Sequence, residues 1–445
     1  MPAKLKHSNL GALRRPIGPH QGLVDLHDLF GSEPCHSGLG TAKRFRMFAL
    51  FILPFAVRND PMTYEWVFYR ALGSLEALML IAPPWYFDGI DKRENSDSWA
   101  TLATTQVTHK YELPTQNHME RVERVVIEES ALTRIKAQYP SPNKIWAETL
   151  GKEIPELRSS INIALMTART RPRAVILWAN CPSVSAAARN QEIPVIHNEL
   201  GPLRSPWFKP TAYFDLNGVN GNTSSLERWE TFRKSAEGVP VLSRKRLLEV
   251  LGARQEGRTS RSRRRDGSVD RRYRAGVALQ VPTDSNLIAF GNGNSNLDAI
   301  LTAQRYFGDV LVRPHPSMPE KHHSLTVDWD ESDDPADFLS KIDHLVTVNS
   351  SLALEAMLRG IPTTILGQSP FAWGANTEAA PQNNKNSREH LLWLNWIVFG
   401  YLIPEDFLFN NSYYNWRLSL DATEHSIYIK NFLFWTRCVE GPDNV

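Results

Sequence analysis

The feature that most constrains the fold is a regular alternation of short apolar runs and amphipathic segments between residues 276 and 367. The runs have the length and β-branched content of buried strands, and the segments between them repeat apolar residues at helical spacing. Strands that alternate with helices form a parallel sheet covered on both faces, and ligands bind at the carboxyl ends of its strands. The predicted strands are 276–281, 309–313, 344–348 and 363–367, and the predicted helices are 294–307, 336–342 and 352–360.

A second region of the same character precedes this one. Residues 173–201 predict a strand, a short helix and a strand, and 211–219 predict a further strand that runs into a glycine turn. At 445 residues the chain is long enough for two or three domains. We therefore predict an α/β protein with two Rossmann-like halves. The predicted elements in the first of these segments are 174–178, 183–190 and 194–197.

An arginine-rich segment, 254–274, separates the two halves and holds nine arginines against three acidic residues. Such a composition does not bury a core, so an exposed linker is the plain interpretation. Attraction to an anionic membrane face or glycan is an alternative. Nucleic acid is not expected as a partner, because the net charge of the chain is only +2. The predicted division is an irregular leader at 1–45, domains at 46–253 and 275–385, and a helical tail at 386–445.

The cysteines and the apolar runs indicate the cellular compartment that the protein occupies. Three widely spaced cysteines without a C-x-x-C pair indicate neither a disulfide framework nor a zinc site. The first residues lack the apolar core of a signal peptide, and the longest apolar runs, 47–57 and 391–403, are too short to span a bilayer. We expect a cytoplasmic protein in which these runs form a buried strand and a core helix. The second run, rich in aromatic residues, also suits a membrane surface.

Polar residues cluster directly after three of the predicted strands. The clusters are QVPTDSN (280–286), RPHPS (313–317) and TVNSS (347–351). Parallel strands end at one edge of their sheet, so we expect these clusters to converge on a single ligand. A proline on each side of His315 fixes the backbone there and makes this imidazole a candidate functional group.

The third cluster leads into a helix, and the first N–H groups of a helix attract anions. Ser350 and Ser351 have the alternative role of helix caps. Glu355 follows Ser351 by four residues, which is too far for a capping box, and it is placed to reach a ribose hydroxyl. Arg313 has two open roles, as the partner of an anionic ligand or of a structural carboxylate.

Two common nucleotide motifs are absent. The chain has no G-x-x-x-x-G-K-[ST] and no G-x-G-x-x-G, which argues against ATP hydrolysis and NAD chemistry. No metal or other cofactor is expected, because an imidazole and a helix N-terminus can take the place of a cation beside a phosphate.

RPHPS, followed by N-S-S-L-A-L-E about thirty residues later, resembles the Kdo transferases of capsule and lipopolysaccharide synthesis. The resemblance extends to E-L-G-P-L-R-S (199–205) and Q-V-P-T-D-S-N (280–286) and covers roughly residues 170–420. It implies a GT-B-like fold with two Rossmann-like domains facing across a cleft, with C-terminal helices packing back. It also implies a CMP-β-Kdo donor held by the C-terminal domain, and a glycan acceptor held by the N-terminal domain.

The resemblance further implies retention of configuration through a glycosyl–enzyme intermediate, with one carboxylate as nucleophile and another as acid/base. Asp284 is the candidate nucleophile, Glu199 the candidate acid/base and His315 the group at the leaving phosphate, while Asp215 competes for either carboxylate role. Capsule relatives carry an acid where Leu200 stands here, which argues against a nucleophile in this loop. The expected substrate-binding residues are Arg204, Gln280, Arg313, Pro316, Ser317, Asn349, Ser350, Ser351 and Glu355.

Two alternatives stay open from the sequence. The same motifs suit a transferase of CMP-sialic acid or another nonulosonate, because they would contact only the CMP. A catalytically inactive glycan-binding subunit of a polysaccharide assembly is the alternative from another class. The expected location is the cytoplasm, with possible peripheral contact with the anionic inner face of the membrane.

Overall fold

The computed structural model describes residues 47–55, 65–93, 116–139, 141–253, 272–316, 326–376 and 387–440. Three sequence-based predictions lie outside these ranges: the leader at 1–45, the arginine-rich segment except for its last three residues, and the role of Ser317. Among the helices described, none has the length and apolar character needed to cross a membrane.

The N-terminal half is built on a seven-stranded sheet with the order β12-β6-β5-β4-β1-β2-β3. Its central part is parallel, and β6 and β12 are added antiparallel at one edge. Alternate residues of the central strand belong to two different apolar cores, one on each face, because helices cover both sides. The strands are β1 (Phe48–Phe51), β2 (Leu78–Ala82), β3 (Val122–Val126), β4 (Val175–Trp178), β5 (Val195–Leu200), β6 (Thr211–Asp215) and β12 (Leu402–Pro404).

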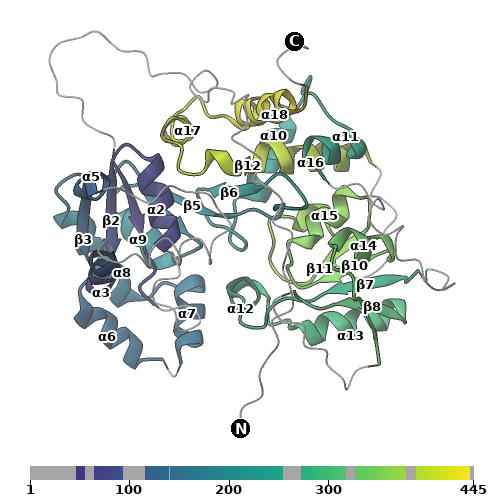
Figure 1. Ribbon diagram of the computed structural model, residues 1–445, viewed down its shortest axis with the longest axis horizontal. Coiled ribbons are helices and arrows are strands. Elements are labelled where there is room, and N and C mark those ends of the chain that lie inside the picture. The colour runs from purple at the N-terminus through teal and green to yellow at the C-terminus, as the bar shows by residue number, and fades with distance from the viewer. Residues whose placement is uncertain are drawn as a thin grey trace, which may run out of the picture.

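The helices of this half lie on both faces of the sheet and beyond its antiparallel edge (Figure 1). Several begin with proline at the first turn, where the missing N–H costs no hydrogen bond. They are α2 (Glu65–Ser74), α3 (Pro84–Arg93), α5 (Gln116–Glu120), α6 (Glu129–Ala137), α7 (Pro142–Gly151), α8 (Pro155–Thr167), α9 (Pro182–Asn190), α10 (Ser225–Lys234) and α11 (Arg244–Val250).

The C-terminal half is built on a five-stranded, wholly parallel sheet with the order β11-β10-β7-β8-β9. Numbered along the chain within each half, both sheets have the Rossmann order 3-2-1-4-5. The strands are β7 (Ala275–Ala278), β8 (Val310–Arg313), β9 (Asp328–Trp329), β10 (Leu345–Thr347) and β11 (Thr363–Ile365), and the helices are α12 (Ser285–Phe290), α13 (Asn296–Phe307), α14 (Pro335–Ser340) and α15 (Leu352–Leu358).

The predicted α/β fold with two Rossmann-like halves is therefore confirmed, and each strand and helix predicted for 276–367 is present with small shifts at its ends. Two short elements within the segment 276–367 were not predicted. α12 has six residues and β9 has two, both too short to show a hydrophobic period.

The C-terminal tail crosses back over both halves, as predicted (Figure 1). The run 391–403 is buried in the protein, but it does not stay helical to its end. α16 (Arg388–Trp396) continues into a π-helical turn (Ile397–Tyr401), and the chain then forms β12 against β6. After it come a 3-10 turn (Glu405–Phe407), α17 (Asn411–Arg417) and α18 (Glu424–Glu440).

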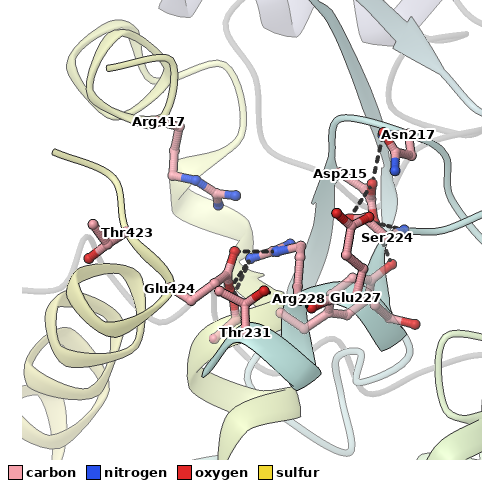
Figure 2. A network of polar contacts seen from close by, with 12 residues as sticks. Asp215, Asn217, Ser224, Glu227, Arg228, Thr231, Arg417, Thr423 and Glu424 are labelled. Atoms are coloured by element: carbon pink, nitrogen blue, oxygen red, sulfur yellow. Dashed lines mark hydrogen bonds and ion pairs between the residues drawn. The ribbon is translucent and has the colours of Figure 1, made fainter. Parts of the chain in front are cut away.

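A buried ion pair fastens the last helix to the N-terminal half (Figure 2). Arg228 on α10 donates to both carboxylate oxygens of Glu424 at the start of α18, at 2.8 and 3.2 Å, and also donates to the carbonyl oxygen of Gly400. The two side chains are only 11% and 15% exposed. A bidentate pair of this kind is geometrically specific and is costly to break on one side.

We expect Glu424→Gln to lower the free energy of unfolding by about 3 kcal/mol, because it leaves the Arg228 guanidinium in a poorly hydrated site without its counter-charge. Urea denaturation followed by circular dichroism measures the change. Glu230→Gln is the matched control, since its pair with Arg233 on α10 is exposed and should contribute less than about 0.5 kcal/mol. Equal effects of the two substitutions would contradict the assignment.

Candidate functional site

The C-terminal sheet brings the three predicted polar clusters to one edge. β10, β7 and β8 are adjacent and parallel, so the segments after them lie side by side. The reversal of strand order between β7 and β10 is the place where doubly wound sheets bind ligands. β7 separates β8 from β10, so His315 follows a strand that ends about 10 Å from the strand before the serine pair.

Gln280 and Asn349 hold the two segments at this reversal together. The Gln280 amide donates to Asn349 Oδ1 at 2.8 Å and accepts from the Asn349 backbone N–H at 3.1 Å. Asn349 also donates to the Asn286 carbonyl oxygen at 3.0 Å. Both predicted substrate-binding amides therefore bond to the protein and position the loop edges.

His315 and Arg313 line a cavity of about 330 Å³ at the end of β8, together with Pro316 and the segment 330–333. Arg313 is buried, and its guanidinium donates to Asp330 at 2.5 Å and to the carbonyl oxygens of Ser332 and Asp333. Of the two roles left open for Arg313, the structure shows the structural carboxylate.

Asp330 belongs to a D-x-D spacing, Asp328-Trp329-Asp330, which the expectation of a metal-free site does not take into account. Here Asp330 pairs with Arg313 and Lys341, and Asp328 accepts a hydrogen bond from Tyr273 at 2.9 Å. Among the described residues, no group of three His, Cys, Asp or Glu side chains is placed to hold a metal ion.

The serine pair and Glu355 lie at the start of α15. Ser350 is half-buried and its Oγ accepts from the Leu352 N–H at 3.3 Å, whereas Ser351 is exposed and makes no capping bond with its side chain. Glu355 is buried and pairs with Arg359 at 3.0 Å. Burial raises the pKa of Glu355, and the charge of Arg359 opposes that rise.

Glu199 stands at the carboxyl end of β5, on the edge of the N-terminal sheet. Position 201, two residues later, requires glycine, because a Cβ there would lie 2.7 Å from the Thr211 backbone. Arg204 closes the turn by donating a hydrogen bond to the Gly201 carbonyl oxygen at 2.8 Å. Glu199 accepts a short hydrogen bond from the side-chain amide of Asn220. Arg204, a predicted substrate-binding residue, thus also braces the loop that carries Glu199.

Asp284 belongs to the other half and acts on Glu199 through its charge. It is the N-cap of α12 and accepts from the Asn286 N–H at 2.8 Å. Burial raises the pKa of Glu199 to about 7; the charge of Arg204 lowers it, and the negative charge of Asp284 raises it further. The two predicted carboxylates, 85 residues apart in the sequence, are therefore close enough to interact.

Asp215, the competing carboxylate, has a structural role. It is buried and accepts five hydrogen bonds, from the N–H groups of Asn217, Gly218 and Ser224, the Ser224 hydroxyl and the Tyr401 hydroxyl. Figure 2 shows Asp215 beside Asn217 and Ser224. A carboxylate satisfied in this way holds the loop 216–224, which argues against a reacting role for Asp215.

That loop contains contacts that the sequence did not reveal. Asn180, at the end of β4, bonds both backbone groups of Val219, and Asn220 has a left-handed backbone at φ 64°. Gly221 packs on Phe290 of α12 so closely that a Cβ would lie 2.0 Å from the ring. Glycine and asparagine in NGVNGN were a signal for unusual backbone, but not for the partner across the interface.

Asn286 is the last residue of the QVPTDSN segment and is not among the predicted site residues. Within the described part of the chain, its buried Oδ1 accepts no hydrogen bond. It lies two residues after Asp284 and bonds the Asn349 segment through its backbone carbonyl. An unsatisfied buried acceptor between two candidate site loops is suited to a ligand hydroxyl or amine.

Part of the chain is similar to a known glycosyltransferase family. Residues 50–224 match the family model of the Glycosyltransferase 99 family N-terminal domain. This match ends at Ser224 and includes Glu199 and the loop around Asn220. It confirms the predicted relationship to glycosyltransferases. The search of curated proteins finds no match.

Similar solved structures are distant. The β-Kdo 2,7 transferase of Thermosulfurimonas dismutans KpsC is 18% identical, covers 62% of this chain and 90% of its own, and has a TM-score of 0.39. The β-Kdo 2,4 transferase of the same KpsC is 16% identical, with coverages of 50% and 78% and a TM-score of 0.33. Anabaena HepE in complex with UDP is 10% identical, with coverages of 88% and 99% and a TM-score of 0.29.

The different surroundings of the two aspartates predict different responses to substitution. Asp215→Asn should lower the free energy of unfolding by about 3 kcal/mol, because an amide cannot accept from all of the donors around it. Asp284→Asn should change it by less than about 0.5 kcal/mol, since asparagine caps a helix as well as aspartate does. Urea denaturation of both variants tests this. A large loss for Asp284→Asn would mean that its charge serves stability.

Proposed function

We propose that this protein is a retaining glycosyltransferase that moves Kdo from CMP-β-Kdo to a glycan acceptor in bacterial surface polysaccharide synthesis. The observation that carries the proposal is the approach of Glu199 and Asp284 from facing halves, with burial and the charge of Asp284 raising the pKa of Glu199 to about 7. Two carboxylates in different environments suit a nucleophile and an acid/base pair. The glycosyltransferase match supports sugar transfer, and the resemblance of the RPHPS and N-S-S-x-x-x-E motifs to Kdo transferases is the reason for proposing this donor.

In the first step Asp284 acts as the nucleophile. A carboxylate oxygen of Asp284 forms a bond to the anomeric carbon of Kdo, and the bond from that carbon to the CMP phosphate oxygen breaks. CMP leaves with the electron pair. His315 donates a hydrogen bond or proton to the departing phosphate, whose developing charge is the feature that a positioned donor stabilises.

In the second step Glu199 acts as the base. The acceptor hydroxyl attacks the anomeric carbon, its proton passes to Glu199, and the bond to Asp284 breaks to restore the carboxylate. A base with a pKa near 7 is well matched to this task at neutral pH. Two displacements at one carbon retain its configuration.

The donor would lie across the edge of the C-terminal sheet. We assign the phosphate to the segment between His315 and the Ser350–Ser351 pair, and the ribose to Glu355. Gln280, Asn349 and Arg313 hold these segments in place through their protein contacts, and Asn286 offers an unsatisfied acceptor beside them.

Substitutions of the two carboxylates should block different steps of the reaction. With CMP-Kdo and no added acceptor, water replaces the acceptor hydroxyl, and the wild type should release CMP in a burst followed by steady turnover. Glu199→Gln should keep the burst and lower the steady rate by about 10²–10⁴-fold. Asp284→Asn should lose the burst. Rapid-quench measurement of CMP and intact-mass detection of a Kdo adduct on Glu199→Gln check both.

The controls separate the alternatives. Asp215 is unsuitable as a control because of its structural role. Asp421→Asn, on the exposed turn before α18, is the matched carboxylate control and should behave as wild type. Faster CMP release from CMP-sialic acid than from CMP-Kdo would favour another nonulosonate donor. Absence of CMP release from either donor would favour an inactive glycan-binding protein and contradict the proposal.

The steady rate should also depend on pH through Glu199. As a base Glu199 must be ionised, so the rate should fall about tenfold per pH unit below its pKa of about 7 and level off above it. Glu199→Gln should remove this dependence from the remaining slow rate. A pH–rate profile of CMP release between pH 5 and pH 9, about two pH units on each side of the Glu199 pKa, tests this dependence. An unchanged profile in the variant would assign the titration to another group.

A further inference from the structure

A pocket of about 430 Å³ opens between the two halves and is not used by the donor or by the proposed chemical steps. Its volume is within the range of small-molecule sites, roughly 300–1,000 Å³. The N-terminal half contributes the segment 220–226 and the C-terminal half the segment 368–373, with Trp393 at the base. Every side chain that lines it is uncharged.

Trp373 gives this pocket an aromatic wall. It is partly exposed, and other tryptophans hold it from behind: its ring lies 5.0 Å from that of Trp229 and 5.6 Å from that of Trp393. Trp229 in turn packs on Trp396 at 5.6 Å. A ring fixed in this way presents an apolar face at little entropic cost.

Amides and hydroxyls surround the aromatic wall. Asn220, Asn222 and Gln368 line the pocket, and the Asn222 N–H donates to Gln368 Oε1 at 3.2 Å across the interface between the halves. Asn220 and Asn222 both have left-handed backbones, at φ 64° and 56°. Such strain persists where the surrounding structure over-determines it, often at ligand sites.

Asn220 connects the pocket to the reacting groups. The same side chain that lines the pocket donates a hydrogen bond to Glu199. Asn220 is therefore shared by the pocket and by the candidate base Glu199. The combination of an aromatic face, neutral polar groups and an adjacent base suits a pyranose ring, whose C–H face stacks while its hydroxyls form hydrogen bonds.

We propose that this pocket binds the acceptor and selects a neutral sugar, a hexose or an N-acetylhexosamine, over an acidic one. This inference rests on the proposed function for its role in transfer. Selectivity follows from the lining, because a sugar carboxylate would lose hydration there without meeting any cation among the lining side chains.

Binding is tested without the donor, by saturation-transfer NMR titration with neutral methyl glycosides of galactose and N-acetylglucosamine and with the acidic methyl glucuronide. The wild type should bind the neutral glycosides and not the acidic one. Trp373→Ala should weaken neutral binding by roughly tenfold, and Trp373→Phe should restore most of it. Trp329→Ala, a partly buried tryptophan on β9 at the opposite edge of the sheet, is the matched control.

Gln368→Ala is the second variant, because its exposed side chain can be removed without disturbing the tryptophan cluster; a severalfold loss of neutral binding is expected. Equal binding of acidic and neutral glycosides, or unchanged neutral binding in both variants, would overturn the inference. Loss of CMP release in the wild type, with neutral binding intact, would overturn the proposed function and leave a neutral-glycan site.

Discussion

The arrangement of the candidate site depends on the Asp215 carboxylate. Its five hydrogen bonds join the end of β6, the first residues of α10 and Tyr401 of the returning tail. The loop between these elements carries Asn220 to Glu199 and Gly221 to Phe290. One buried anion thus sets the conformation of the loop through which the two halves meet. Its five donors are neutral backbone and hydroxyl groups, and the charge of the nearby Arg228 guanidinium also acts on Asp215.

The alternation of strands and helices in the second half explains which parts of the fold and site could be predicted from the sequence. Strands and helices of the second half are long enough to show their period, and their order determines the edge at which the three polar clusters meet. The β-α pattern therefore predicted the neighbourhood of Gln280, His315 and Ser350. It did not predict that Gln280 and Arg313 would bond mainly to protein, because their partners Asn349 and Asp330 are set by side-chain geometry.

Contacts between the halves could not be predicted from local patterns. α12 is too short to show a period, yet it carries Asp284 at one end and Phe290, which packs on Gly221, at the other. The pairing of Glu199 with Asp284 came from the family resemblance, and its physical basis appears only in three dimensions. Likewise, the apolar run 391–403 predicts a helix throughout, but its last residues belong to β12, which pairs with β6. Without this pairing β6 would be an open edge strand.

The origin of β12 has a consequence for biosynthesis. The N-terminal sheet receives its edge strand, Leu402–Pro404, from a segment that leaves the ribosome about two hundred residues after β6. Until then the apolar face that the tail covers is exposed to solvent. Because exposed apolar surface binds chaperones, we expect the nascent first half to bind them. The architecture therefore ties completion of the first sheet to synthesis of the second half, because β12 follows every strand of the second sheet in the sequence.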